Sequence, residues 1–445
     1  MRDSLQPPSL RRSDLPGKSD NARLGLSRRQ RAKSLVTTSL LALLLSVGLW
    51  SFLRPLPSAA TRPSVGFSSY YTAARLLREG TELTSAWEDD WFGREIRRFA
   101  PTVSDIWRPN PPSAALLALP VSWFAYRTAR VLWTVGSLLI LLALWWWSVR
   151  TLRPRGRELV WLLALFLLFD PFRACLWYGQ VYIALAGLLT LVIRAERGGE
   201  GESARPGHRT LVSGVAIGLL IALKTALLPL LLGGLQRRRR RTLIAMVTTI
   251  GCVASVSVVL GGTAPWRSYL AYLMSPESQL ARPERTSTAY QSLFSLCSRV
   301  TSPDAQWNPA PWLDLPWIGI GAYLVGAFLL GWTALRHWAR GRDRDLALAR
   351  LALLQVILSP WTLDYHYPLV WPVLVVWGSA APLGRWNGKL IAGLAVVLLL
   401  IPARWYCAPG LQEGLLALFA YPKLYGALLL FALCGERTSV SCPSR

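Results

Sequence analysis

The chain has 445 residues, of which 52% are hydrophobic, and its mean hydropathy is +0.33. The apolar residues form continuous runs of about 14 to 25 residues, which excludes both a soluble protein with one large core and the alternating pattern of a membrane β-barrel. The formal net charge of +25 does not indicate a nucleic-acid partner, because the basic residues lie in short segments between the apolar runs. The composition therefore predicts an all-α polytopic membrane protein.

Residues 1–33 are polar and basic, which predicts a disordered cytoplasmic tail. Residues 27–31 resemble a twin-arginine export signal, but the apolar run that follows, at 35–53, is long for such a signal. An uncleaved first helix is therefore expected. The basic tail places the N-terminus in the cytoplasm of a multi-pass protein of the bacterial inner membrane.

A long polar segment, residues 54–112, is expected to form the first extracytoplasmic loop. Within it, Tyr71, Ala74 and Leu77 lie at helical spacing, which predicts a helix that lies on the membrane interface or on the protein and ends near Gly80. An acidic cluster follows, which consists of Glu88, Asp89, Asp90, Glu95 and Asp105.

Basic segments punctuate the apolar runs at residues 150–157, 194–209, 237–241, 336–344 and 385–389. All of them can lie in the cytoplasm if the short run at 113–125 dips into the membrane without crossing it. This arrangement predicts a single transmembrane domain over residues 34–434 with about 12 spans. It also predicts a second large extracytoplasmic loop at 263–316 and a cytoplasmic tail at 435–445.

The same topology gathers the polar side chains that are costly to bury on the extracytoplasmic face. They are Tyr70, Tyr71, the acidic cluster, Asp170, Arg173, Gln180, Lys224, Asp364 and His366. No glycine-rich phosphate cradle lies on the cytoplasmic side, so no nucleotide is expected. The six cysteines show no zinc-binding spacing, so no metal and no other cofactor are expected.

Several motifs together resemble those of glycosyltransferase family 87, in the family's order. They are Phe67-Ser-Ser-Tyr-Tyr-Thr-Ala-Ala-Arg, Asn110-Pro-Pro-Ser-Ala-Ala-Leu-Leu, Gly179-Gln-Val-Tyr, residues 213–224 ending in Lys224, Tyr290-Gln-Ser-Leu, and Ser359-Pro-Trp-Thr-Leu-Asp-Tyr-His-Tyr. The resemblance implies a membrane enzyme of the GT-C superfamily that takes a sugar, typically mannose, from a polyprenyl phosphate. It also implies transfer to a glycolipid or glycan acceptor on the extracytoplasmic face, with inversion at the anomeric carbon.

Roles for individual residues follow from that resemblance and from their chemistry, each beside a structural alternative. Lys224 or Arg173 is expected to hold the donor phosphate, although a lysine at a hairpin tip also snorkels to the interface. Gln180 and Gln291 either bind sugar hydroxyls or satisfy backbone groups where helices break. Tyr70 and Tyr71 either contact the sugar or pack within the interfacial helix.

The chain departs from the family pattern at the residue expected to act as general base. The family usually has an aspartate before the Phe67 motif, where this chain has Gly66, and its late Asp-His-His pattern reads Asp364-Tyr365-His366 here. The candidate replacements are His366, Asp364, Asp89 and Asp90, while Asp364 and His366 alternatively cap a helix end. A catalytically inactive family member and a lipid transporter remain the alternative functions. An active transferase requires Lys224, Gln180 and His366 to share one cavity.

Overall fold

The computed structural model describes residues 28–108, 110–197, 206–231, 240–275, 283–340, 343–380 and 386–435. Within these ranges the chain is helical, and the isolated bridge between Asp304 and Asn308 is its only extended pairing. The basic segment at 237–241, the tail at 435–445 and the tail at 1–33 lie largely outside the described residues. The predicted disorder at 28–33 is corrected, because helix α1 (Arg28–Leu53) already begins there. Arginine and lysine are good helix formers, so the apolar helix extends into the basic segment at little cost.

Five helical segments of the described chain are long and apolar enough to cross a membrane. The first, Leu35–Thr61, covers most of α1 and the short α2 (Leu56–Thr61). The others are α5 (Tyr126–Leu152), the consecutive helices α6 (Arg157–Leu168) and α7 (Asp170–Tyr178), α11 (Arg240–Gly261) and α15 (Pro316–Ala339). A bent pair, η8 (Gly414–Ala420) and α20 (Pro422–Leu433), makes a sixth if it counts as one span. The protein is thus an all-α polytopic membrane protein, while about 12 spans stays a prediction.

The short run at 113–125 does not form a spanning helix, as the charge pattern required. It folds into two 3₁₀ turns, η2 (Pro112–Leu117) and η3 (Pro120–Trp123). Each turn is far shorter than the ~30 Å of the hydrocarbon core. Pro112 and Pro120 each start a turn, because a proline lacks the N–H that a helix interior needs.

The first loop is built on α2 (Leu56–Thr61), α3 (Phe67–Arg78) and α4 (Asp89–Phe99). The predicted C-cap of α3 is confirmed: Gly80 has φ +73°, and Thr81 N–H donates to Leu76 C=O at 2.9 Å. Of the two predicted positions of this helix, on the membrane or on the protein, the structure has the second, because α3 is buried on almost every side. It packs against η2, η3 and α4, which explains why Tyr70 and Tyr71 are both 2% exposed.

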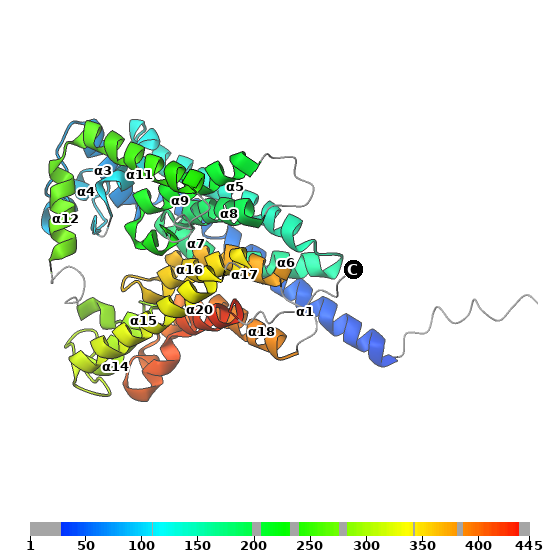
Figure 1. Cartoon of the computed structure of the whole chain (residues 1–445). Helices are drawn as coiled ribbons and strands as arrows, with labels where there is room; N and C mark the ends of the chain where they lie inside the picture. The colour runs from blue at the N-terminus through cyan, green and yellow to red at the C-terminus, as the bar shows by residue number, and fades with distance from the viewer. Residues whose placement is uncertain are drawn as a thin grey trace, which may run out of the picture.

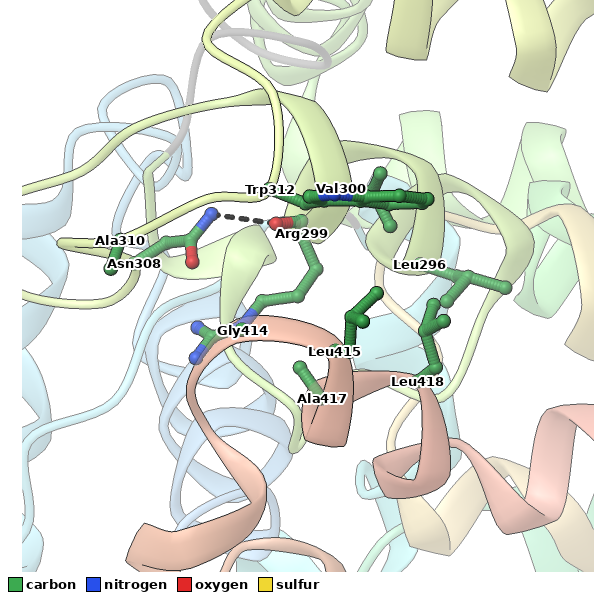
Figure 2. A pocket seen from close by; sticks show the side chains of 10 residues that line it. All are labelled: Leu296, Arg299, Val300, Asn308, Ala310, Trp312, Gly414, Leu415, Ala417 and Leu418. Carbon is green, nitrogen blue, oxygen red and sulfur yellow. Dashed lines mark hydrogen bonds between the residues drawn. The ribbon is translucent and has the colours of Figure 1, made fainter.

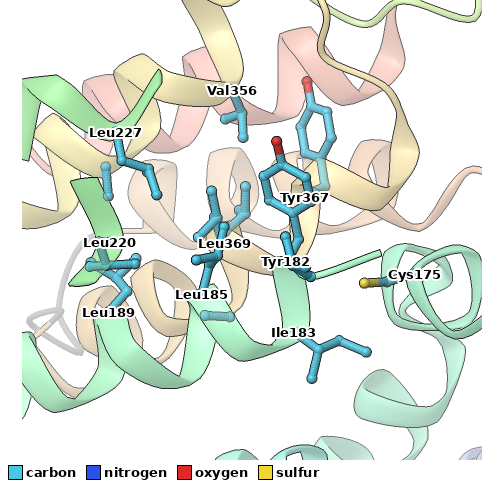
Figure 3. Close-up of a cluster of buried hydrophobic side chains, with 14 of the residues drawn as sticks. Cys175, Tyr182, Ile183, Leu185, Leu189, Leu220, Leu227, Val356, Tyr367 and Leu369 are labelled. Carbon is cyan, nitrogen blue, oxygen red and sulfur yellow. The ribbon is translucent and has the colours of Figure 1, made fainter. Parts of the chain in front are cut away.

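The central core lies between α8 (Tyr182–Arg197), α9 (Pro206–Leu223), α16 (Arg344–Leu358) and α17 (Val370–Ala380). Figure 3 shows Leu185 and Leu189 of α8 beside Leu220 of α9, with Val356 and Leu369 near them. Helices α9 and α11 approach closely at a small-residue seam. A Cβ at Gly214 would lie 2.5 Å from Thr242 C=O, and one at Gly218 would lie 2.8 Å from Met246 C=O.

The remaining helices surround this core. They are η4 (Thr225–Leu230), α12 (Ala264–Met274), η5 (Pro283–Thr286), α14 (Leu293–Thr301), η6 (Asp364–Leu369), α18 (Trp386–Leu400), α19 (Ala403–Tyr406) and η7 (Pro409–Leu411). Figure 1 shows α3, α4 and α12 together at one end of the molecule, with α1 and α6 extending toward the opposite end. The first-loop helices therefore cover one end of the helical bundle.

Candidate functional site

A pocket of about 210 Å³ opens where the first-loop helices meet the breaks in the bundle helices. Its walls come from segments that are far apart in the sequence. They are Val65, Gly66, Ser69, Tyr70, Asp105, Ile106, Arg108, Asn110, Gln180, Tyr182, Lys224, Tyr290, Trp361, Leu363, Tyr365 and His366. The prediction that Lys224, Gln180 and His366 share one cavity is confirmed, and Tyr70 joins them there.

Lys224 supplies a positive charge to this pocket from the break between α9 and η4. Its Nζ donates to Asn110 Oδ1 at 2.5 Å, and the Asn110 amide donates to Trp107 C=O at 2.6 Å. Burial lowers the pKa of Lys224 to about 8, against the opposing effect of the Asp105 charge. The ammonium has further donors to offer beyond its single bond to Asn110, so it can hold an anion in the pocket.

Gln180 is positioned by a tight turn after α7. Gly179 has φ +66°, and Arg130 Nη2 donates to the carbonyls of Leu176 and Trp177 at the end of that helix. The turn leaves no room for a side chain at residue 179, because a Cβ there would lie 2.5 Å from Arg130 Nη1. The result is a buried amide, 8% exposed, at the pocket wall.

Asp105 brings a carboxylate to the pocket from the loop after α4. Its Oδ2 accepts the Gly66 N–H at 2.5 Å and the Ser69 hydroxyl, and its Oδ1 accepts the Ile106 N–H at 2.9 Å. Burial raises the pKa of Asp105, while these three donors and Lys224 act in the opposite direction. The carboxylate is therefore held in one orientation by three neighbours.

His366 faces the pocket from η6, between two aromatic rings. Its ring centroid lies 4.2 Å from that of Tyr182 and 4.7 Å from that of Tyr365. Its Nδ1 lies 3.0 Å from Leu363 N and 3.2 Å from Leu363 O, so the backbone of Leu363 holds the ring in either tautomer, which is the helix-end cap given above as the structural alternative. Burial, and then the charge of Lys224, lower the pKa of His366 well below its usual value. His366 is thus a neutral imidazole that caps the start of η6 and lines the pocket.

The other predicted site residues lie outside the pocket. Tyr71 donates its hydroxyl to Phe124 C=O at 2.8 Å and packs against Phe67, which is the structural alternative given above. Arg173 forms an ion pair with Asp170, three residues before it on α7. Neither side chain contributes to the walls of the cavity.

Gln291 is engaged by backbone groups on every side. Its amide donates to Thr288 C=O at 2.7 Å and to Ala420 C=O at 2.8 Å, and its Oε1 accepts the Lys423 N–H at 3.2 Å. The Gln291 C=O accepts the Tyr367 hydroxyl at 2.7 Å. This glutamine therefore joins α14, η6 and α20, as the structural alternative states.

The three predicted carboxylates also lie away from the pocket walls. Asp364 accepts the Tyr406 hydroxyl and lies 3.5 Å from Lys423 Nζ, whereas its neighbours Leu363 and Tyr365 line the pocket. Asp89 accepts the Arg108 Nε–H at 2.7 Å, and Asp90 is exposed in the first turn of α4. Their catalytic roles stay predictions without a geometric basis in this structure.

Sequence reasoning missed Asp105 and Asn110 as site residues. Asp105 stood in the acidic cluster, but nothing in its local sequence distinguished it from a solvated loop residue. Asn110 begins one of the quoted motifs, and that position was the available signal. Tertiary contacts bring both to the site, because their partners Gly66 and Lys224 are 39 and 114 residues away.

Three other cavities differ from the pocket in size or lining. A crevice around Arg299 and Asn308 holds only about 10 Å³, which is room for about one water, and Figure 2 shows Arg299 C=O bonded to the Asn308 amide there. An apolar cavity of about 410 Å³ lies beside Tyr406 and Pro422, and a groove of about 240 Å³ runs past Val65. Among the described residues, no group of His, Cys, Asp and Glu side chains is arranged to hold a metal ion.

The model of glycosyltransferase family 87 matches residues 109–360, which is more than half of the chain. The chain belongs to glycosyltransferase family 87. No curated protein and no solved structure gives a significant match. The family 87 segment contains Asn110, Gln180 and Lys224, whereas Gly66, Asp105 and His366 lie outside it. Membership identifies the protein as a membrane glycosyltransferase with a donor and an acceptor substrate.

Proposed function

We propose that this protein transfers a sugar, with mannose as the expected one, from a polyprenyl phosphate to a lipid or glycan acceptor of the cell envelope. The pocket end of the bundle then faces the extracytoplasmic side of the bacterial inner membrane, and the transfer inverts the anomeric carbon. The observation that carries the proposal is a buried lysine in a pocket that also contains amide, imidazole and aromatic groups. A cation for phosphate beside hydrogen-bonding and flat apolar groups for a sugar is the chemistry that this donor requires.

The size and lining of the pocket support a sugar phosphate. A volume of about 210 Å³ is in the range of one hexose, and Tyr182, Tyr290, Trp361 and Tyr365 provide aromatic faces. Lys224 supports the phosphate assignment, because its ammonium group makes one hydrogen bond within the protein, to Asn110, and has further donors for a phosphate. Gln180, with its side chain in the wall, is a donor and acceptor for sugar hydroxyls.

The apolar cavity supports a lipid carrier. It is lined by Val397, Leu400, Ile401, Pro402, Trp405, Tyr406, Leu411, Phe419 and Pro422. Tyr406 lines the apolar cavity and donates to Asp364 of η6, the helix whose His366 lines the pocket. An isoprenoid chain in this cavity would lie beside the pocket that takes its phosphate.

The test is sugar transfer and donor binding by the full-length protein purified in detergent. Polyprenyl-phosphate mannose and its glucose counterpart serve as donors, octyl mannoside serves as the acceptor probe, and binding is measured without acceptor. We expect transfer from the mannose donor, and Lys224→Met to weaken donor binding by about 10- to 100-fold, since a charge-assisted bond is lost. Lys389→Met is the matched control, because Lys389 is exposed on α18.

Two results would contradict the proposal. Equal donor binding by wild type and Lys224→Met removes the phosphate assignment. If the wild-type protein binds neither donor and transfers neither sugar, a polyprenyl-phosphate sugar is not its substrate.

A further inference from the structure

Sugar transfer to a hydroxyl acceptor needs a group that takes the hydroxyl proton, and the pocket walls contain few groups able to do so. This argument rests on the function proposed above. Among the described residues that line the pocket, Asp105 carries the one carboxylate. His366 is a weak proton acceptor, because it is buried between the rings of Tyr182 and Tyr365 and its pKa lies well below its usual value. Lys224 must stay protonated to hold the phosphate.

We propose that Asp105 is the general base of this transferase. Its carboxylate is half-buried, lines the pocket, and is oriented by the Gly66 N–H, the Ser69 hydroxyl and the Ile106 N–H. A carboxylate oxygen accepts more than one hydrogen bond, so these contacts leave acceptor capacity on the pocket side. Asp105 is not among the four catalytic residues predicted from the sequence.

A second space close to Asp105 supports this role. Asp105 lines the pocket with Lys224, and the groove of about 240 Å³ shares Val65 with that pocket and includes Ser104, the neighbour of Asp105 in the sequence. The groove is lined by Ser58, Ala59, Arg62, Pro63, Ser64, Val65, Thr102, Val103, Ser104, Trp177 and Tyr178. An acceptor that lies along its hydroxyl and aromatic side chains would present a hydroxyl group beside Asp105.

The backbone at Gly66 explains why the carboxylate comes from residue 105. Gly66 has φ +92°, and a Cβ there would lie 2.8 Å from Gln180 Cδ and 2.9 Å from Tyr178 C=O. A side chain at 66 is therefore excluded both by the backbone conformation and by the space that Gln180 occupies. The Gly66 N–H instead binds Asp105, so the carboxylate of 105 lies directly against the backbone of residue 66.

The reaction then proceeds with all protons and electrons accounted for. The acceptor oxygen forms its bond to the anomeric carbon while its proton moves to Asp105. The bond between the anomeric carbon and the phosphate oxygen breaks, and its electron pair leaves with the polyprenyl phosphate, which Lys224 stabilises. The proton on Asp105 is released to water after the glycoside departs.

The charged and titratable groups around Asp105 define the pH dependence of this step. Lys224 comes from the end of α9, Arg108 from its own loop, Tyr70 from α3, and Tyr365 and His366 from η6. The pKa of His366 lies well below its usual value, that of Lys224 is about 8, and burial raises the pKa of Tyr70 and of Tyr365. We therefore assign the loss of transfer on the acidic side of the optimum to protonation of Asp105. Burial raises the pKa of this carboxyl group above its usual value.

The experiment compares transfer by wild type, Asp105→Asn, Ser69→Ala and Asp314→Asn as a function of pH, with donor binding measured in parallel. Asparagine preserves the shape and an acceptor for Gly66. We expect Asp105→Asn to bind the donor like wild type and to lose about 10²- to 10⁴-fold in kcat, together with the acidic limb of the pH profile. Asp314→Asn is the matched control, because Asp314 is exposed and lies outside the pocket.

The Ser69→Ala variant retains Asp105 and changes only a hydrogen bond to its carboxylate. The Ser69 hydroxyl lowers the pKa of Asp105, so its loss raises that pKa. The acidic limb should move to higher pH, while kcat above the limb stays within a few-fold of wild type. This readout is independent of whether Asp105→Asn folds.

The outcomes separate this inference from the proposed function. If wild type transfers the sugar and folded Asp105→Asn does so at the same rate, or if Ser69→Ala leaves the acidic limb in place, Asp105 is not the base and the function stands. If wild type neither binds nor uses a polyprenyl-phosphate sugar, the proposed function fails, and the base assignment fails with it.

Discussion

Two buried polar regions lie on either side of η6, and they differ in how much hydrogen-bonding capacity remains open. On one side, Asp105, Gln180, Lys224 and His366 face a pocket of about 210 Å³. On the other, Asp364 lies 3.5 Å from Lys423 Nζ, and Lys423 also donates to Leu399 C=O at 3.1 Å. Both regions contain a carboxylate and a lysine, but only in the first do these two side chains themselves line one of the cavities described above.

The comparison separates groups that bind substrates from groups that join helices. The Asp364 region is closed by contacts within the protein, because Tyr406 and Lys423 occupy the carboxylate and backbone groups occupy Gln291. A buried ion pair of this kind contributes to the specificity of packing more than to net stability. In the pocket, by contrast, the side chains retain donors and acceptors for a ligand.

The largest expected effect is on stability, and it comes from a variant that disrupts the ion pair of Asp364 and Lys423. Lys423→Met leaves the Asp364 carboxylate buried without its counter-charge, and we expect a loss of about 3–5 kcal/mol in the free energy of unfolding. Chemical denaturation in detergent measures it. The double variant Lys423→Met, Asp364→Leu should recover most of that loss, because no unpaired charge remains. A single variant as stable as wild type would show that this pair does not hold the helices together.

The second prediction tests whether residue 66 has room for a side chain. Gly66→Ala strains a positive φ and pushes on Gln180, whereas Gly80→Ala strains a similar φ, +73°, with no atom within 4 Å of its Cβ. We expect Gly80→Ala to cost about 1–2 kcal/mol of stability, and Gly66→Ala to cost about 1–3 kcal/mol more and to reduce transfer. Equal losses from the two variants would mean that Gln180 yields easily and that residue 66 tolerates a side chain.

A third prediction uses the charge of Lys224. Because its pKa is lowered to about 8, the ammonium is present below pH 8 and is lost as the pH rises through that value. The affinity for polyprenyl-phosphate mannose, a phosphodiester whose own charge is constant here, should fall by up to about tenfold per pH unit above 8. Affinities measured from pH 6.5 to 9.5 test this. Binding that is flat across the range would contradict a phosphate-holding Lys224.

The smallest expected effect concerns His366. A neutral imidazole in the pocket wall can make one hydrogen bond to a ligand, so His366→Phe should reduce kcat/KM by about 2- to 10-fold. The acidic limb of the pH profile should remain where it is in wild type. If the limb disappears in His366→Phe but persists in Asp105→Asn, the imidazole is the base and the roles assigned to the two residues are reversed.

Much of the site was predictable where a single polar residue lies at the end of an apolar run. Lys224 ends a long apolar run, and Gln180 and His366 stand at breaks between such runs. Polar groups at these places are costly, so their presence pointed to the pocket. The same reasoning pointed to Asp364 and Gln291, whose side chains turn toward other helices instead. Adjacent residues such as 364 and 366 face different environments, and hydropathy alone does not separate them.

Sequence alone determined that this is an all-helical membrane protein, that residues 113–125 do not span, and that α3 stops just before Gly80. These properties arise from local hydropathy and backbone conformation, which act within a few residues. The tertiary structure decided that Asp105 enters the pocket, that Asp364 pairs with Lys423, and that Gln180 fills the space beside Gly66. Those contacts join residues from 39 to 114 positions apart, and only the packing of whole helices fixes which of them meet.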